Sequence, residues 1–222
     1  MDPNQTEQIS KDPVAIRQQV EFYFSDANLP MDKFFLSLTK GSQNKPVEIK
    51  LIHGFKRMRH FQPYTTVVAA LEDSEKLEVI RGAGHGTEVV KRKVPLSDEF
   101  TVDDIYKNKQ IREATANSRT AYVYGFKEER ANHQEEVETW AKALAPDVLS
   151  VRLERDFQGK FRDGVFIELG DKSQLEEFLE QFEGGKEYPE DQYVLHSSPI
   201  YCELLGSRAH DLASASCLSW TK

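Results

Sequence analysis

Residues 16–35 read IRQQVEFYFSDANLPMDKFF, and the interpretation of the chain starts from this stretch. Five of its twenty residues are Phe or Tyr, and none is Gly. The polar residues interleaved with the rings include Gln19, Tyr23, Asp26, Asn28 and Asp32. A buried helix pair accounts for many rings but does not require these polar groups. Stackable rings mixed with hydrogen-bonding groups are what a pocket for nucleobases requires.

Two helices are predicted in and around this stretch. The first begins after Asp12, a suitable N-cap that precedes a proline, and runs to about Phe24. A turn follows, and Pro30 opens the second helix, which runs to about Thr39. The Lys-Gly-Ser sequence at 40–42 then ends it.

The next fifty residues predict a small helical domain that ends in a β-hairpin. Residues 46–53 are a short apolar piece, either helix or strand, and 64–71 form a third full helix. Two short strands, 77–81 and 88–93, flank a Gly-rich turn at 82–86. Helices followed by such a hairpin are typical of a winged-helix domain, in which the hairpin is the wing.

The second half of the chain alternates between strands and helices. The predicted strands are 120–126, 148–154, 164–169, 192–196 and 200–204, and the predicted helices are 132–144 and 173–182. The last two strands can also be one interrupted strand. The resulting β-α-β-β-α-β order is the ferredoxin-like plan.

These patterns predict an α+β protein with two domains. The predicted segments are a flexible tail (1–11), a winged helix (12–94), a linker (95–118), a ferredoxin-like domain (119–205) and a disordered tail (206–222). At 222 residues the chain is long enough for a core in each domain.

Composition and charge exclude several classes of protein. With 39% hydrophobic and 30% charged residues and no apolar run of membrane-spanning length, we expect a soluble protein without a membrane segment. The two cysteines, Cys202 and Cys217, form neither a disulfide framework nor a metal-ligand pattern, which favours a reducing compartment. The net charge is −8, and all of the negative excess lies after residue 94, because residues 1–94 carry a small positive excess. Any RNA site must therefore rely on a local pocket and not on a broad basic field.

The sequence QQVEFYFSDANLPMDKFF, residues 18–35, resembles the La motif. The βαββαβ pattern from residue 120 resembles an RNA recognition motif (RRM). Together, over about 12–204, they resemble the N-terminal half of a La protein, of fungal type. The resemblance implies an α+β fold in which a winged-helix La motif precedes a ferredoxin-like RRM.

The resemblance also implies a function. The family recognises and protects the 3′ oligouridylate (UUU-OH) end of newly made RNA polymerase III transcripts, such as precursor tRNAs, and assists their processing and folding. We therefore expect a nuclear, monomeric RNA-binding protein that is not an enzyme and has no cofactor, metal or membrane partner. RNA is expected to bind in a cleft between the La motif and the RRM.

The family's base-contacting positions fall on six residues of the first domain and two of the second. They are Gln19, Phe22, Tyr23, Asp32, Phe34 and Phe55, and then Tyr122 and Phe166. Phe22 stands where many members have Tyr, so a hydroxyl is lost but stacking is kept. A basic run at 56–60 can contact phosphates, and within it Arg57 is the expected phosphate-binding residue.

Each role follows from the chemistry of the side chain. Flat rings stack on unpaired bases, at about 1–3 kcal/mol per base. The amide of Gln19 suits the uracil edge. The carboxylate of Asp32 can accept hydrogen bonds from both hydroxyls of a terminal ribose and would repel a 3′-phosphate. We expect Gln19, Phe22 and Tyr23, at i, i+3 and i+4, to share one helix face.

Other interpretations stay open. Phe24 and Phe35 are expected to be core residues. Asp32 can instead be a first-turn residue that interacts with the dipole of the helix after Pro30. Asp26 and Asn28 are better turn-formers than ligands. The basic run at 56–60 can be a solvated face.

The second domain departs from the RRM pattern. Gly164 stands where a second aromatic residue is expected, and Asp163 replaces the usual Gly, so Tyr122 and Phe166 either contact RNA or lie beside the La motif. Two rival functions remain: a La-related protein that reads poly(A) or a cap, and an RRM that serves as a protein-interaction module. The Gly-rich turn at 82–86 is not a phosphate loop, since no Lys and helix follow it.

Overall fold

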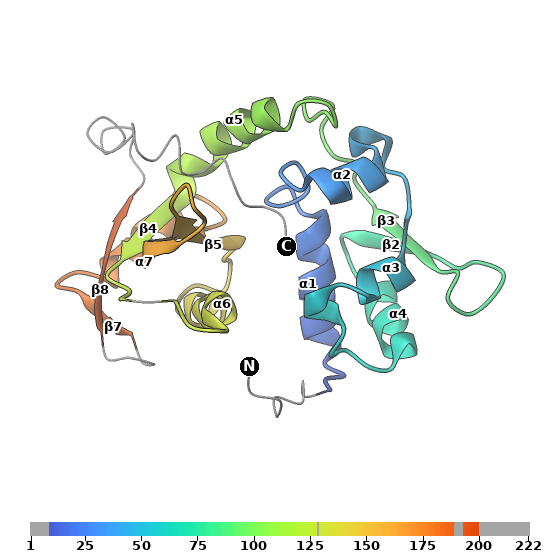
Figure 1. The fold of residues 1–222 in the computed structure, drawn as a ribbon, viewed down its shortest axis with the longest axis horizontal. Helices are drawn as coiled ribbons and strands as arrows, with labels where there is room; N and C mark the ends of the chain where they lie inside the picture. Colours follow the sequence, from blue (N-terminus) through green and yellow to red (C-terminus); the bar gives the residue numbers. More distant parts are fainter. Residues whose placement is uncertain (1–8, 128, 189–192, 200–222) are drawn as a thin grey trace. The chain divides into compact units, whose positions relative to one another are not determined.

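The computed structural model describes residues 9–127, 129–188 and 193–199 (Figure 1). The chain divides into two compact units, Met1–Gln110 and Ile111–Lys222. The division falls inside helix α5 (Ile105–Ala116), in the segment predicted to be a linker. The described residues form helices and two sheets, which confirms the predicted α+β class.

The first unit combines four helices with a small antiparallel sheet. The helices are α1 (Pro13–Phe24), α2 (Lys33–Thr39), α3 (Ile49–His53) and α4 (Tyr64–Glu72). The strands are β1 (Val47–Glu48), β2 (Leu77–Ile80) and β3 (Val89–Arg92), in the order β1-β3-β2. The predicted hairpin is present, and the loop between β2 and β3 projects from the unit (Figure 1).

Two local predictions for this unit need correction or refinement. The second helix begins at Lys33 and not at Pro30, because the residues before Asp32 form turns and the Asp32 side chain caps the helix. The apolar piece at 46–53 is both a strand and a helix: β1 ends at Glu48, and α3 follows at once.

The core of the first unit lies between α1, α2 and α4. Phe24 and Phe35 are each 1% exposed, with ring centroids 4.8 Å apart, which confirms both as core residues. Phe100, in the predicted linker, is also buried, and its carbonyl oxygen lies 3.5 Å from the position that a Cβ on Gly41 would take. Residues beyond 94 therefore pack as part of this unit.

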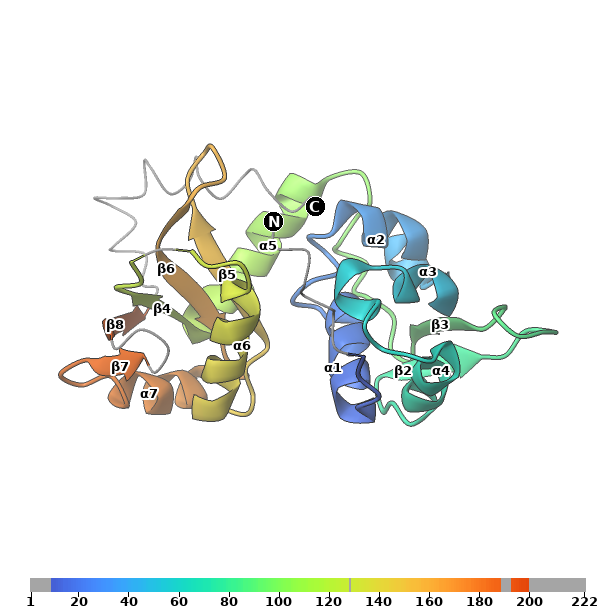
Figure 2. The same cartoon turned by 60° about the horizontal axis from the view of Figure 1, so that its bottom comes forward.

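The second unit is a five-stranded antiparallel sheet with two helices. Its strands are β4 (Thr120–Tyr124), β5 (Ser150–Arg155), β6 (Phe161–Glu168), β7 (Lys186–Tyr188) and β8 (Tyr193–Pro199), and its helices are α6 (His133–Leu144) and α7 (Lys172–Glu180). A 3-10 turn, η3 (Asn117–Arg119), leads into β4. The strand order is β5-β6-β4-β8-β7 (Figure 2).

The predicted β-α-β-β-α-β order is present in β4-α6-β5-β6-α7-β8. The short strand β7, which pairs with β8, was not predicted. The predicted strand at 200–204, both cysteines and the tail from 206 lie outside the described residues.

Alternation along the strands separates two faces of this sheet. Ala121, Val123, Val165 and Ile167 point into a core that also contains residues of α6 and α7, such as Val137 and Phe178. The residues between them in sequence therefore lie on the opposite face. That face carries both candidate RNA-binding residues of the second unit, Tyr122 and Phe166.

Candidate nucleic-acid interface

Four aromatic side chains of the first unit lie in a row. Phe22 and Tyr23 come from α1, Phe34 from α2, and Phe55 from the residue before the 3-10 helix η2 (Lys56–Met58). The ring centroids are 6.4 Å apart for Phe22–Tyr23, 5.4 Å for Tyr23–Phe55 and 6.3 Å for Phe55–Phe34. We call these four residues the ring cluster. The structure thus brings together all four aromatic residues predicted for the first domain.

The ring cluster is supported from the core and open to solvent. The buried ring of Phe35 lies 6.1 Å from Tyr23 and 6.1 Å from Phe55. The Phe34 side chain is 54% exposed, whereas Phe22, Tyr23 and Phe55 are half-buried. A ring that is exposed at one face and packed at the other is available for stacking with little loss of side-chain entropy.

Asp32 begins the helix that carries Phe34. Its Oδ1 accepts a hydrogen bond from the backbone N–H of Phe35, at 2.9 Å. This is the one hydrogen bond that its carboxylate accepts within the described part of the chain. Asp32 is half-buried, and its second carboxylate oxygen remains available to a ligand. Asp32 is therefore an N-cap, a more specific structural role than the first-turn position considered from the sequence.

Asn28 connects Asp32 to the ring cluster. Its Nδ2 donates to the carbonyl oxygen of Tyr23, at 3.1 Å. Its backbone carbonyl oxygen accepts hydrogen bonds from the backbone N–H groups of Met31 and Asp32. Asn28 is 4% exposed, and its side chain is used within the turn as predicted. Asp26 likewise pairs with a basic residue, Arg92, at 2.7 Å.

Gln19 lies on α1, one turn before Tyr23, and is half-buried. Its side chain makes no hydrogen bond among the residues that the structure describes, so its amide is available. Arg57 lies in η2, two residues after Phe55, and is half-buried. Lys33 and Lys56, each next to a residue of the site, are exposed. Lys33 was not predicted as a site residue, and its only sequence signal is its position beside Asp32.

The cap gives a stability prediction. Asp32→Ala should lower the free energy of unfolding by about 0.5–2 kcal/mol, because α2 loses a side-chain cap. Asp32→Asn should leave it nearly unchanged, since Asn caps helices as well as Asp does. Urea unfolding of both variants measures the difference. Equal stabilities would contradict the capping role, and Asp32→Asn is the variant of choice for binding experiments.

The second unit carries a second row of rings on the face opposite its core. Tyr122 and Phe166 are directly paired across β4 and β6, with centroids 5.2 Å apart. The row continues to Tyr124, stacked on Tyr122 at 5.6 Å, and to His196 of β8, at 5.7 Å from Tyr124. His196 was missed by the sequence analysis, because its partner on β4 follows only from the strand register.

A hydrogen bond to a carboxylate and close packing restrict this second row. The Tyr122 hydroxyl donates to Oε2 of the buried Glu154, at 2.6 Å. The ring of Tyr122 also lies across Gly164, where any Cβ would collide with it. The absence of an aromatic residue at 164 thus has a packing reason. The hydrogen bond to Glu154 fixes the Tyr122 ring in the sheet and leaves its hydroxyl less available to a ligand.

A buried ion cluster joins Arg112, from the part of α5 that belongs to the second unit, to one end of the same face. The Glu168 side chain is 0% exposed, and it accepts hydrogen bonds from Arg112, from Arg119 at 2.9 Å and from the Ser150 hydroxyl at 3.0 Å. Burial alone would raise the pKa of Glu168. The hydrogen bond and charge of Arg112, with the charge of Arg152, outweigh burial and lower that pKa below its ordinary value.

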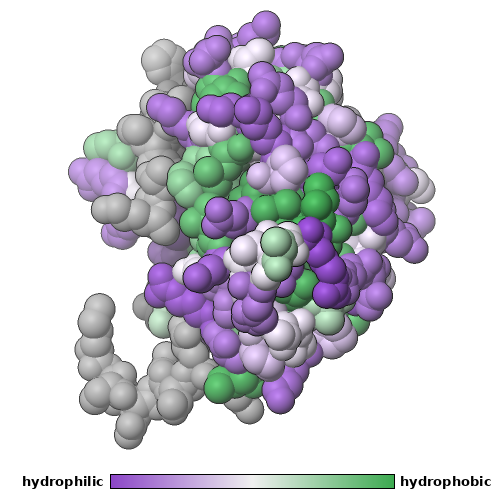
Figure 3. Space-filling model, turned by 90° about the vertical axis from the view of Figure 1, so that its right-hand side faces the viewer, coloured by the Kyte–Doolittle hydropathy of each residue, from purple (hydrophilic) through white to green (hydrophobic). Residues whose placement is uncertain are grey.

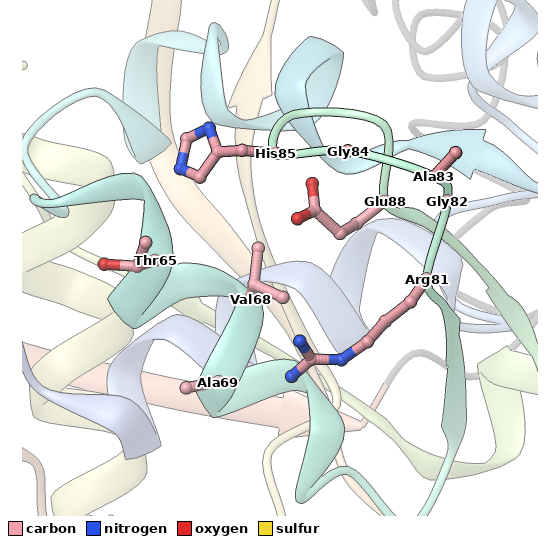
Figure 4. A pocket seen from close by; sticks show the side chains of 9 residues that line it. All are labelled: Thr65, Val68, Ala69, Arg81, Gly82, Ala83, Gly84, His85 and Glu88. Carbon is pink, nitrogen blue, oxygen red and sulfur yellow. The ribbon is translucent and has the colours of Figure 1, made fainter.

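A hollow of about 360 Å³ lies between α4 and the β2–β3 loop (Figure 4). Glu88 at its edge accepts hydrogen bonds from the Tyr64 hydroxyl and the Gly86 N–H, both at 2.8 Å. Burial, followed by the contact with Glu88, raises the pKa of Tyr64. Backbone hydrogen bonding within Glu88, followed by the Tyr64 hydroxyl, lowers the pKa of Glu88. These contacts fix the loop to α4.

The hollow shares no residue with the ring cluster. Strand β3, and not a helix, follows the Gly-rich turn, in agreement with the prediction that this turn is not a phosphate loop. Figure 3 views the side on which Figure 1 draws this loop. Hydrophobic residues gather in the middle of that face, among hydrophilic ones (Figure 3). The ring cluster, with available polar groups beside it, is the better candidate interface.

Two features are absent from the described residues. None of their helices is long and apolar enough to cross a membrane. Among the same residues, no group of three or more His, Cys, Asp and Glu side chains could hold a metal ion.

Comparison with known proteins shows what this chain is similar to. Residues 16–73 match the family model of the La domain. Two La protein homologs are similar over most of this chain: one from Aedes albopictus, 27% identical over 79% of this chain and 44% of its own length, and one from Drosophila melanogaster, 28% identical over 78% and 43%. The La-related protein 6A of Arabidopsis thaliana is 36% identical over 44% of this chain and 25% of its own length.

The La-domain match begins within α1, extends to the end of α4 and contains seven of the nine predicted site residues. The chain spans less than half the length of these relatives.

Proposed function

We propose that this chain, an RNA-binding protein of the La family, binds the 3′ oligouridylate end of newly made RNA polymerase III transcripts such as precursor tRNAs. Binding protects a UUU-OH end and assists processing and folding of the RNA. The proposal includes a nuclear location, no catalytic activity and RNA as the main partner.

One observation carries this proposal. The ring cluster lies next to Asp32, whose carboxylate has an oxygen available for a ligand. The stacking surface and the carboxylate are joined through Asn28, which contacts both Tyr23 and the backbone of Asp32. A base stacked on the rings and a ribose hydrogen-bonded to the carboxylate require such a short, rigid connection.

Each group has a role in this proposal. Phe22, Tyr23, Phe34 and Phe55 stack on terminal bases, and Gln19 recognises the edge of a uracil. Asp32 accepts hydrogen bonds from the 2′- and 3′-hydroxyls. Arg57 contacts a phosphate, and the exposed Lys33 and Lys56 add positive charge beside the site. Since the bound RNA end is uncharged at its 3′-hydroxyl, recognition rests on hydrogen bonds and stacking more than on net charge.

The direct test compares two RNAs that differ only at the end. A short RNA ending in UUU-OH should bind more tightly than the same RNA with a 3′-phosphate, since the phosphate would face a carboxylate. Fluorescence anisotropy titrations at one fixed salt concentration measure both. Equal affinities would overturn end recognition. Tighter binding of an A-ended RNA than of a U-ended one would instead favour a La-related protein of other specificity.

For the second unit, a protein-interaction role is the alternative. The bond between Tyr122 and Glu154 favours it, because the hydroxyl of Tyr122 is already used within the sheet. Under this alternative, Tyr122→Ala and Phe166→Ala leave the affinity for U-ended RNA unchanged. A loss of RNA affinity in these variants would assign the sheet face to RNA.

A further inference from the structure

A buried asparagine of α5 contacts the turn that carries Asp32. Asn108 is 0% exposed and lies 78 residues after Pro30. Its Nδ2 donates to the carbonyl oxygen of Pro30, at 3.1 Å, and to that of Thr101, at 2.7 Å. Its Oδ1 accepts from the backbone N–H of Thr101, at 2.9 Å. The whole side-chain amide is therefore used to join two backbone segments.

The carbonyl of Pro30 belongs to the turn between α1 and α2. This turn is held on one side by Asn28, whose side chain reaches Tyr23 and whose carbonyl oxygen reaches Asp32. Asn108 holds it from another element, only two residues before the carboxylate. Pro30 is itself buried, so its carbonyl loses access to water if the amide is removed.

We infer that Asn108 is a positioning residue for recognition of the RNA 3′ end. The inference rests on the proposed function and extends it to a residue beyond the 12–94 domain. A carboxylate that accepts from two adjacent hydroxyls needs a fixed position, because hydrogen bonds weaken steeply with distance and angle. Stacking on the ring cluster tolerates small shifts. Loosening the turn therefore affects the discrimination between ends more than the affinity for the bases.

The test uses the whole chain and two variants. Asn108→Ala removes all three hydrogen bonds, whereas Asn108→Asp keeps an acceptor for the Thr101 N–H and loses both donor bonds, to the carbonyl oxygens of Pro30 and Thr101. The measured quantity is the ratio of affinities for UUU-OH and UUU-3′-phosphate RNA. We expect both variants to reduce this ratio at least fivefold, through weaker binding of the hydroxyl-ended RNA. The affinity for the phosphate-ended RNA should change less than twofold.

A matched control is Asn44→Ala. Asn44 is another amide that joins two backbone segments of the first unit: it donates to the Arg92 carbonyl at 2.8 Å and accepts from the Arg92 N–H at 3.2 Å. Asn44 has a φ of 51°, a conformation that strains an alanine. The control variant therefore loses hydrogen bonds, as the Asn108 variants do, and gains backbone strain in addition. Asn44→Ala should have the same ratio of affinities for the two RNA ends as the unchanged protein. All titrations are run below the unfolding temperature of each variant.

The outcomes separate the inference from the proposed function. If the unchanged protein discriminates between the ends and both Asn108 variants retain its ratio, the positioning role is wrong and the proposed function stands. If Asn44→Ala reduces the ratio as much as the Asn108 variants do, the effect is general destabilisation and the inference is again overturned. If the unchanged protein does not discriminate, the proposed function fails and the inference fails with it.

Discussion

Glu168→Gln should lower the free energy of unfolding of the second unit by about 3–5 kcal/mol. The carboxylate is fully buried and is shared by Arg112 and Arg119, and the side chain of Arg112 is only 4% exposed. Removing the negative charge leaves buried guanidinium groups without compensation, which costs more than the pair itself contributes. Fluorescence of Trp140, which packs against the core of this unit, follows its unfolding in urea.

The same cluster predicts a pH dependence. Because the pKa of Glu168 is lowered in the folded protein, its stabilising effect is present above the ordinary glutamate pKa. The effect is lost as the pH falls through the lowered, folded-state pKa. The stability difference between the unchanged protein and Glu168→Gln should therefore be constant near neutral pH and shrink in acid.

Glu129→Gln is the control for this substitution. Glu129 also pairs with an arginine, Arg155, but both side chains are about one-third exposed. A solvent-screened pair contributes only about 0–1 kcal/mol, so this variant should be nearly as stable as the unchanged protein. If both glutamine variants lost the same free energy of unfolding, the buried Glu168 cluster would contribute no more to stability than the exposed pair, which would contradict the prediction.

Phe34→Ala should weaken binding of U-ended RNA by about 1–3 kcal/mol, the contribution of one base–aromatic stack. The ring is 54% exposed and contacts Phe55 at its edge, so its removal should change stability little. This makes Phe34 a cleaner probe than Tyr23 or Phe55, which also pack on the buried Phe35. Anisotropy titration measures the affinity, and urea unfolding checks the fold.

Leu51→Ala is the matched control for Phe34→Ala. Leu51 is an exposed apolar residue of the same unit, 39% exposed, outside the ring cluster. Its substitution should leave RNA affinity unchanged. Unaltered affinity in Phe34→Ala, or an equal loss in Leu51→Ala, would remove the ring cluster as the stacking surface.

The sequence was most informative where local signals agree with packing. The periodicity of 13–24, with the N-cap Asp12, predicts α1 correctly, because cap, proline and buried positions all favour the same helix. The βαββαβ order follows in the same way from strands and helices of ordinary length. The start of α2 was misplaced because Pro30 is a common first helical residue. The Asp32 side chain, however, caps three residues further along.

What escaped prediction depends on contacts between distant residues. Asn108 has no local signal, since its partner Pro30 is 78 residues away. The collision of a Cβ at 164 with the Tyr122 ring follows from the pairing of β4 with β6. The same holds for Glu168, whose arginine partners lie 56 and 49 residues before it. Such residues are recognisable only once strand register and helix packing are known.

The most direct test of the central claim combines a substitution in the protein with a change at the RNA end. The unchanged protein and Asp32→Asn are each titrated with UUU-OH and UUU-3′-phosphate RNA, and urea unfolding confirms that both are equally stable. If Asp32 reads the terminal diol, the hydroxyl-ended RNA loses about 1–3 kcal/mol of binding free energy in the variant. The phosphate-ended RNA should bind the variant as well as or better than it binds the unchanged protein. Equal changes for both RNAs would contradict recognition of the 3′ end by Asp32.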